Sequence, residues 1–349
     1  MKKTVCVLFG GKSAEYSISL RSCASVLKNI DRDKFDIITV GITSDGVWYL
    51  YEGSIENIEN DTWADGNLKR VCIDHNALEP YILVLDGETY TKIKADVFFP
   101  VLHGTNGEDG RLQGLFDMAG VKYVGVGTLC SAVGMDKEYA KIVFEHAGIK
   151  QADWVTVHAY DDKDAKIGEI ENKFEYPVFV KPANAGSSYG IGKAKTRAEL
   201  FSAMDNAFKY DKKILVEELL TGHEVECAVL GNSGNVIAST VGEVVADEEF
   251  YTFDSKYSST SKSQLHIPAL ISESAIEKVR CEAVKAFEAL SGRGLSRVDF
   301  FVDGEDVRIN EINTLPGFTS ISMYPKLFAY CGIEYKELLT RLVELAFEE

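Results

Sequence analysis

Four polar side chains gather around one predicted β-hairpin near the end of the chain. The stretch SRVDFFVDGEDVRINEINTLPGF reads as two short strands around an acidic turn, followed by a Pro-Gly break. If the loop is Gly-Glu-Asp, Asp299 faces Glu311 and Arg297 faces Asn313 on one side of the pleat. A two-residue loop would shift the pairing by one position and separate the two carboxylates across the sheet.

The types of these side chains indicate a metal and phosphate site. Two adjacent carboxylates repel each other unless a cation lies between them, and carboxylate and amide oxygens are ligands that Mg²⁺ prefers, with phosphate oxygens completing its shell. An exposed, solvated strand face is the alternative. It explains less well the neighbouring Arg297 and the expected apolar pair of Phe301 and Ile309 at the far end of the same side.

A second candidate site is the stretch VFVKPANAGSSYGIGK. Lys181 ends an apolar run, and the glycine-serine loop around Ser187 and Ser188 can fold over an anion with backbone N–H and hydroxyl donors. The lysine precedes the glycines, so this is not a Walker A motif, and an ordinary hairpin is the alternative. Lys137, in the preceding predicted helix, strengthens the phosphate interpretation.

Two carboxylates flank an apolar connector in ILVEELLTGHEVECAVL. Glu217 and Glu224 lie on either side of it. A connector with free backbone amides can hold adenine, and a carboxylate can hold ribose hydroxyls. A plain strand and turn is the simpler alternative for this stretch.

The N-terminal region carries polar residues at predicted strand ends. Glu15 follows a glycine turn, and His103 follows another buried run. Ligand-binding groups of α/β sheets lie at the carboxyl ends of the strands. A carboxylate there suits an ammonium ligand and a histidine suits a carboxylate, although a lone histidine is often purely structural.

The elements that position these residues fall into three predicted blocks. Residues 1–125 alternate apolar strands with helical patterns, which predicts an α/β domain with a parallel sheet. Residues 126–217 begin near a helix capped by Asp136 and read as a mixed or antiparallel sheet with helices on one side. Residues 218–349 contain the hairpin and a long irregular loop, 246–268, of the kind that is functional or disordered.

Composition excludes several partners. The 349 residues carry a net charge of −17, which argues against nucleic acid or an anionic membrane surface as a partner. Seven widely spaced cysteines without a CxxC motif predict reduced, buried thiols in a cytoplasmic protein. No apolar run approaches the roughly 18 residues of a membrane helix.

Taken in order, the motifs resemble a known family. FGGKSAEYSISL, LHGTNGEDGRLQG, GMDKEYAK, VKPANAGSSYGI, VEELLTGHEVECAVL, SRVDFF and NEINTLPGFTSISMYP occur as they do in D-alanine–D-alanine ligases of the ATP-grasp superfamily. The resemblance spans nearly the whole chain. It implies an α/β ATP-grasp fold, in which an N-terminal parallel-sheet domain is followed by two α+β domains that enclose ATP.

The resemblance also implies roles for individual residues. Glu15 would hold the ammonium of the first D-alanine, His103 would lie near its carboxylate, and Ser322 would receive the carboxylate of the second. Arg297 would stabilise the transferring phosphoryl group, and the backbone N–H of Gly317 would help form an oxyanion site. The nucleotide and metal residues implied are Lys137, Lys181, Ser187, Ser188, Glu217 and Glu224 for ATP, and Asp299, Glu311 and Asn313 for two Mg²⁺ or Mn²⁺ ions.

The implied reaction makes D-alanyl-D-alanine for peptidoglycan synthesis through an acyl phosphate. Water would destroy that intermediate, so the loop 246–268, with Lys256 and Tyr257 matching the family's Lys-Tyr pair, would close as a lid together with Ser187 or Ser188. A homodimer is the usual assembly in the family.

Three alternatives remain open at this stage. Met323, beside Ser322, favours a D-alanine methyl, but the insertion GVWYLYEGSIENIENDTWADGN, Thr252-Phe253 and Ile321 resemble the branch that uses D-serine. A non-catalytic ATP-binding regulator would be expected to lose a metal ligand or Arg297. Another ATP-grasp carboxylate–amine ligase would lack Glu15 and His103.

Overall fold

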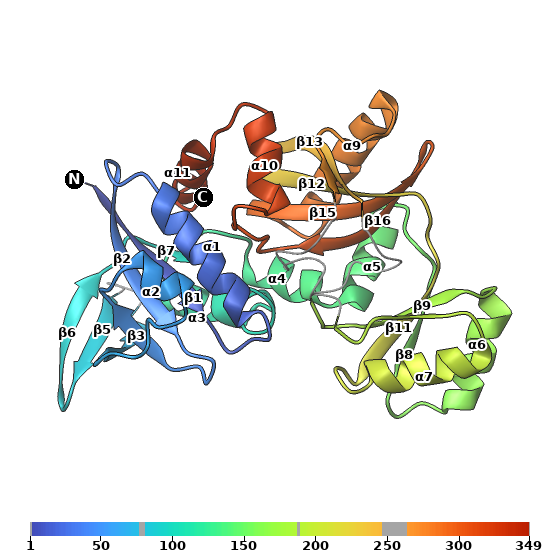
Figure 1. Ribbon diagram of the computed structural model, residues 1–349, viewed down its shortest axis with the longest axis horizontal. Coiled ribbons are helices and arrows are strands. Elements are labelled where there is room, and N and C mark those ends of the chain that lie inside the picture. The colour runs from blue at the N-terminus through green and yellow to red at the C-terminus, as the bar shows by residue number, and fades with distance from the viewer. Residues whose placement is uncertain (1, 77–80, 187–188, 246–263, 349) are drawn as a thin grey trace.

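The computed structural model describes residues 2–76, 81–186, 189–245 and 264–348. Its strands form three sheets, one for each part of the chain (Figure 1). The N-terminal sheet lies at one end of the molecule and the central sheet at the other, and the C-terminal sheet lies next to both.

The N-terminal sheet has a parallel centre and an antiparallel extension. Its order is β6 (Thr89–Lys94), β5 (Tyr81–Asp86), β4 (Lys69–Ile73), β3 (Trp48–Tyr51), β2 (Phe35–Ile42), β1 (Lys3–Gly10) and β7 (Val97–Pro100). β1 pairs in parallel with β2 and β7, as predicted, whereas the pairs from β2 to β6 are antiparallel. The insertion noted in the sequence, residues 46–67, contains one of these antiparallel strands, β3.

Apolar side chains along β1 point alternately to the two faces of this sheet, and both faces are buried there. Val5, Val7 and Phe9 pack into a core with α1 (Tyr16–Asn29), and Cys6 and Leu8 pack into another with α3 (Arg111–Ala119). The short helix α2 (Ile55–Glu59) lies against α1. A strand buried on both faces is typical of the parallel part of an α/β domain.

A tight turn after β1 delivers Glu15 to the start of α1. Gly10 has a φ of +86°, and a Cβ atom on it would lie 2.1 Å from the carbonyl oxygen of Ile42, so only glycine fits there. The Ser19 hydroxyl accepts a hydrogen bond from the Gly10 amide at 2.8 Å and donates one to the Val101 carbonyl. These bonds tie α1 to the carboxyl ends of β1 and β7.

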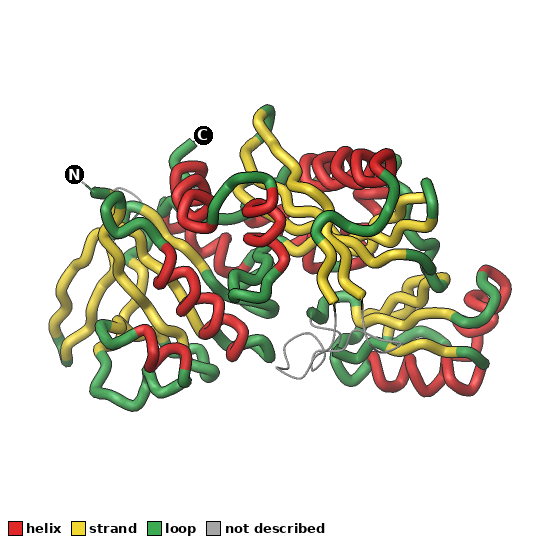
Figure 2. Tube along the Cα trace, turned by 45° about the horizontal axis from the view of Figure 1, so that its top comes forward, coloured by secondary structure: helices red, strands yellow, loops and turns green. Residues whose placement is uncertain are grey.

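The central sheet is fully antiparallel, with helices on one face. Its order is β10 (Gly192–Ala194), β9 (Val178–Pro182), β11 (Lys213–Glu218) and β8 (Trp154–His158), and α6 (Lys163–Lys173) and α7 (Arg197–Ala207) cover its outer side (Figure 2). Val180 and Val216 join the helices in one core. Successive side chains of a strand point to opposite faces of the sheet. Lys181 and Glu217 follow Val180 and Val216 directly, so they lie on the face away from α6 and α7.

The C-terminal sheet carries the hairpin at its edge. Its order is β14 (Gln264–His266), β13 (Asn235–Val245), β12 (His223–Asn232), β15 (Gly294–Asp303) and β16 (Asp306–Asn313), all antiparallel. Along β12, Val225 and Cys227 face α9 (Glu273–Ala289), and Leu230 faces α10 (Met323–Tyr330) and α11 (Tyr335–Leu345).

Two helices connect the N-terminal and central parts. They are α4 (Thr128–Met135) and α5 (Lys137–His146). The predicted cap is confirmed, because the Asp136 carboxylate accepts hydrogen bonds from the Glu138 and Tyr139 amides, and Gly148 follows the helix with a φ of +67°. Phe144 of α5 lies in the same apolar core as α9.

The seven cysteines are free thiols. Cys6, Cys23, Cys130 and Cys227 are buried as predicted, but the expectation is wrong for Cys72, Cys281 and Cys331, which are exposed. Cys72 shows the reason, because it alternates with the buried Val71 and Ile73 on the solvent side of β4. Among the helices of the described ranges, none combines the length and apolar character needed to cross a membrane.

Candidate active site

The hairpin places its polar residues opposite one another. Arg297 pairs with Asn313 and Asp299 pairs with Glu311, as predicted. The predicted loop is wrong, however: Asp303 pairs with Asp306, so only two residues form the turn.

A β-bulge reconciles the two-residue turn with the carboxylate pair. Phe300, rather than Phe301, pairs with Ile309, and the next pair is Asp299 with Glu311, so Asn310 is the extra residue on β16. A bulge of this kind re-aims a side chain. The Asn310 amide oxygen accepts a hydrogen bond from Lys181 Nζ at 3.0 Å, which links the hairpin to the central sheet.

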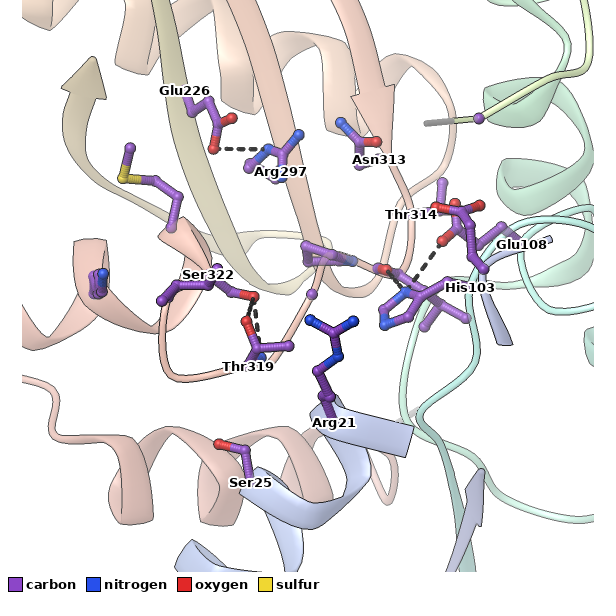
Figure 3. A pocket seen from close by; sticks show the side chains of 18 of the residues that line it. Arg21, Ser25, His103, Glu108, Glu226, Arg297, Asn313, Thr314, Thr319 and Ser322 are labelled. Atoms are coloured by element: carbon purple, nitrogen blue, oxygen red, sulfur yellow. Dashed lines mark hydrogen bonds and ion pairs between the residues drawn. The ribbon is translucent and has the colours of Figure 1, made fainter. Parts of the chain in front are cut away.

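Arg297 is held by two carboxylates. Its Nε and Nη2 atoms each donate to one oxygen of Asp299 at 2.7 Å, and Nε lies 3.1 Å from Glu226 Oε2 (Figure 3). The Asn313 amide donates to Asp299 at 3.0 Å. A bidentate arginine–carboxylate pair fixes the guanidinium plane, so Arg297 is pre-oriented at the cavity wall.

Glu311 lies close to the ammonium group of Lys137, the first residue of α5. Its Oε2 atom lies 3.6 Å from Lys137 Nζ, which also donates to the Ala185 carbonyl at 2.8 Å. Asp299, Glu311 and Asn313 thus present oxygen atoms on one face beside two cationic side chains. Oxygen donors of this kind fit a hard divalent cation. No cluster of three or more His, Cys, Asp or Glu side chains that could bind a metal occurs among the described residues, so this set needs Asn313 as its third member.

A cavity of about 790 Å³ joins the three parts of the chain. Nine residues predicted for the site line it, namely Glu15, His103, Lys137, Arg297, Glu311, Asn313, Gly317, Ser322 and Met323. Lys181, Glu217, Glu224 and Asp299 are not among its lining residues; Asp299 is buried directly behind Arg297.

Glu15 reaches its place because two glycines make room for it. A Cβ atom on Gly104 would lie 2.4 Å from Glu15 Oε2, and one on Gly186 would lie 2.9 Å from the same oxygen. Gly104 also has a φ of +67°. The carboxylate of the N-terminal part therefore lies directly against the start of the glycine-serine loop of the central part.

His103 is buried within a polar network. Its Nε2 atom lies 3.1 Å from Ser22 Oγ, and its Nδ1 atom lies 3.1 Å from the Leu315 carbonyl and 3.5 Å from Glu108 Oε1 (Figure 3). Burial lowers the pKa of His103, but the hydrogen bond and charge of Glu108, together with the charge of Glu15, raise it overall. Burial and the charge of Glu15 raise the pKa of Glu108, although His103 opposes this.

This network predicts a pH dependence for the binding of a carboxylate ligand beside His103. A histidine with a raised pKa carries its charge below that pKa and loses it as the pH rises through it. We expect kcat/KM for a substrate whose carboxylate binds beside His103 to fall with increasing pH, in a phase whose midpoint lies above the usual histidine value of about 6.5. In the His103→Gln variant this phase should be absent from the pH–rate profile; an unchanged phase would assign it to another group.

The loop after β16 forms the wall at the other end of the cavity. Ser322 Oγ accepts a hydrogen bond from the Thr319 amide at 3.0 Å and lies 2.8 Å from Thr319 Oγ1 (Figure 3). A Cβ atom on Gly317 would lie 2.7 Å from Ser322 Oγ, so the loop closes tightly there. Met323 is buried, and a Cβ atom on Gly242 of β13 would lie 2.8 Å from its sulfur.

Lys181 and Glu217 belong to a buried ion cluster. Glu217 Oε2 lies 2.6 Å from Lys181 Nζ, and Glu217 Oε1 lies 3.0 Å from Lys141 Nζ. Burial raises the pKa of Glu217, but the two ammonium groups outweigh burial and lower it. The Glu217 carboxylate is therefore ionised and held from both sides.

Other predicted residues lie elsewhere. Glu224 lies on β12 opposite Phe301 and is partly buried. Ser187, Ser188, Lys256 and Tyr257 lie outside the described residues, as does most of the predicted lid. Its last residues, 264–268, contain β14, which pairs with β13.

Comparisons with known proteins agree with this geometry. Residues 4–126 match the family model described as D-ala D-ala ligase N-terminus, and residues 143–344 match D-ala D-ala ligase C-terminus. The chain belongs to the D-alanine–D-alanine ligase family.

Three proteins illustrate the similarity to this family. The chain is 50% identical to the D-alanine–D-alanine ligase of Acetivibrio thermocellus, over 99% of this chain and 96% of that one. It is 48% identical to the enzyme of the same name from Ruminiclostridium cellulolyticum, with the same coverage. Among solved structures, VanG D-Ala:D-Ser ligase from Enterococcus faecalis has a TM-score of 0.91 at 41% identity, covering 99% of this chain and 100% of that one.

Sequence reasoning missed several residues of this family member's cavity. Glu108, Glu226 and Arg21 line it, and Arg21 points into it from α1 (Figure 3). Glu226 could have been found, because period-two alternation places it on the same face of β12 as Glu224, two positions earlier in the same motif. Arg21 and Glu108 offered no comparable signal, since their placement depends on how α1 and the loop after β7 pack.

Proposed function

We propose that this protein joins two D-alanines to form D-alanyl-D-alanine, with hydrolysis of ATP to ADP and phosphate. The observation that carries the proposal is the shared cavity, in which Glu15 and His103 face the same space as Arg297 and Glu311. This supports an amino-acid site next to a phosphoryl-transfer site. The curated relatives named D-alanine–D-alanine ligase support the same activity.

The first D-alanine would lie between the N-terminal groups and the hairpin. Its ammonium would pair with Glu15, and its carboxylate would lie near His103, whose raised pKa favours the cationic form. Its carboxylate oxygen would attack the γ-phosphate of ATP, breaking the bond to the ADP oxygen and giving an acyl phosphate. Arg297, already fixed by Asp299 and Glu226, would stabilise the charge on the transferring group.

Asp299, Glu311 and Asn313 would hold two divalent ions, Mg²⁺ or Mn²⁺. When bound, these ions would neutralise phosphate charge. Lys137 and Lys181 would bind phosphates, Ser187 and Ser188 would cover them, and Glu217 and Glu224 would line the adenine and ribose site. Lys256 and Tyr257 would belong to the lid.

The second D-alanine would complete the reaction. Its carboxylate would bind Ser322, and its amine would attack the acyl carbon. The tetrahedral oxyanion would be stabilised by the Gly317 amide and Arg297. Collapse would release phosphate and form the peptide bond, with the amine proton passing to solvent or to a phosphate oxygen.

The remaining predictions concern organisation. We propose domain boundaries at 125/126 and 217/218, a homodimer, and a cytoplasmic enzyme of peptidoglycan precursor synthesis. Size-exclusion chromatography with light scattering tests the oligomeric state directly.

One assay tests the function. Phosphate release from ATP should require D-alanine and a divalent ion, and chromatography should identify D-alanyl-D-alanine as the product. Nucleotide binding without ligation would instead support a regulatory ATP-binding protein.

D-Alanine–D-serine ligation is the second candidate. The similarity to VanG D-Ala:D-Ser ligase supports it. Met323 favours D-alanine, because a serine hydroxyl facing its apolar side chain would lose a hydrogen bond, at about 1–3 kcal/mol. Selection between a methyl and a hydroxymethyl group is limited to roughly 10- to 200-fold. With equal D-alanine and D-serine, we therefore expect mainly D-alanyl-D-alanine.

The Met323→Arg variant should increase relative D-serine use, because a guanidinium at the cavity wall offers donors to the hydroxyl. Because Met323 is packed against Gly242, the matched Met323→Leu variant controls for repacking and should retain the wild-type product ratio. The measurement is the product ratio in the competition assay. Predominant D-alanyl-D-serine from the wild type would contradict D-alanine selection.

A further inference from the structure

A third charged residue, Lys141, completes the buried cluster of Lys181 and Glu217. Its side chain is 5% exposed, and those of Lys181 and Glu217 are 8% and 4% exposed. Lys141 Nζ lies 3.0 Å from Glu217 Oε1, donates to the Ala152 carbonyl at 3.0 Å and lies 5.2 Å from the centre of the Trp154 ring.

Three separate elements bring this cluster together. Lys181 lies on β9 and Glu217 on β11, where Leu215 pairs with Lys181 and Phe179 with Glu217, so the two charged residues are diagonal neighbours on one face. Lys141 comes from α5, which packs beside that face rather than on the side covered by α6 and α7.

The charges of the cluster do not cancel. Among these three groups, two ammonium groups share one carboxylate, which leaves one positive charge. Burial lowers the pKa of Lys141, and the charges of Glu217 and Asp153 oppose this. Lys181 donates to Glu217 and Asn310, and a lysine ammonium has three donors, so one N–H of Lys181 remains beyond these two bonds. Without Lys141, Lys181 and Glu217 would form a neutral pair.

We propose that Lys141 is a positioning residue for nucleotide binding. Lys141 neutralises part of the negative charge of Glu217. The positive charge of Lys181 is therefore not fully neutralised by Glu217 and can attract the phosphates of the nucleotide. Burying a lysine ammonium costs folding free energy, and an apolar side chain of similar length would stabilise the fold at least as well. The charge therefore needs a functional reason. This inference rests on the proposed role of Lys181 in ATP binding.

The test measures Mg-ADP affinity by calorimetry. Lys141→Met should weaken binding by about tenfold or more, because the neutralised Lys181 loses a charge-assisted contact. KM for D-alanine should remain within about twofold, since Glu15 and His103 are unaffected. Lys163→Met is the matched control: Lys163 also pairs with a carboxylate, Asp205, and lies over an aromatic ring, Phe201, but on the outer helices. It should bind Mg-ADP as the wild type does.

A double variant separates this role from simple packing. In the Glu217→Gln background Lys141 should no longer matter, because no carboxylate remains whose charge it could share with Lys181. The Lys141→Met/Glu217→Gln protein should therefore bind Mg-ADP as Glu217→Gln does, within about twofold.

The outcomes are distinct. Equal affinity of the wild type and Lys141→Met, or a further large loss in the double variant, would overturn the role of Lys141 while leaving the ligase function intact. A wild type that does not bind Mg-ADP would overturn the proposed function itself.

Discussion

Replacing Glu311 by glutamine is expected to reduce ligation by about 10²- to 10³-fold or more, because the divalent ion that would neutralise the transferring phosphoryl group would lose a ligand. Glutamine keeps the shape of the side chain but removes the charge that would attract the divalent ion. The measurement is phosphate release from ATP with D-alanine at saturating Mg²⁺.

The fold should tolerate this change. Glu311 is about one-third exposed, and its ion pair with Lys137 is 3.6 Å long, so losing the pair costs less than about 1 kcal/mol of stability. Thermal unfolding without metal should therefore be nearly unchanged. Glu305→Gln is the matched control on the same hairpin, because Glu305 lies in the exposed turn and bonds Ser272 and Ser274 instead. Near-normal turnover in Glu311→Gln would show that the metal assignment is wrong.

The second large effect is expected for Glu15→Gln. The charge-assisted contact to the D-alanine ammonium would be lost, which should lower kcat/KM for D-alanine by about 10²-fold. Glutamine is the same size as glutamate, so the close contacts with Gly104 and Gly186 are kept. Calorimetry should give an Mg-ADP affinity within about twofold of the wild type.

The proximity of Gly186 makes the affinity measurement informative. Glu15 belongs to the N-terminal part but lies against the loop proposed to cover the phosphates. A large loss of nucleotide affinity would mean that Glu15 acts through this loop rather than on the amino acid. Glu88→Gln, in the exposed turn between β5 and β6, controls for removal of a carboxylate from the same sheet.

Much of the local structure could be predicted from the sequence. The apolar run of β1 and the Asp136 cap depend on neighbouring residues and on short-range periodicity. The pairing of Asp299 with Glu311 was also predicted, although from a three-residue loop that the structure does not have. The seven ordered motifs were enough to indicate the family, because each keeps its residue types within a short stretch.

The tertiary structure alone decided how these pieces meet. The bulge at Asn310 allowed a two-residue turn and the carboxylate pair to coexist, and it turned Asn310 toward Lys181 on another sheet. The contacts of Glu15 with Gly186, and of Lys141 with Glu217, likewise join segments far apart in the chain. Such contacts depend on how sheets and helices pack against one another, and no local spacing or periodicity of the sequence encodes that packing.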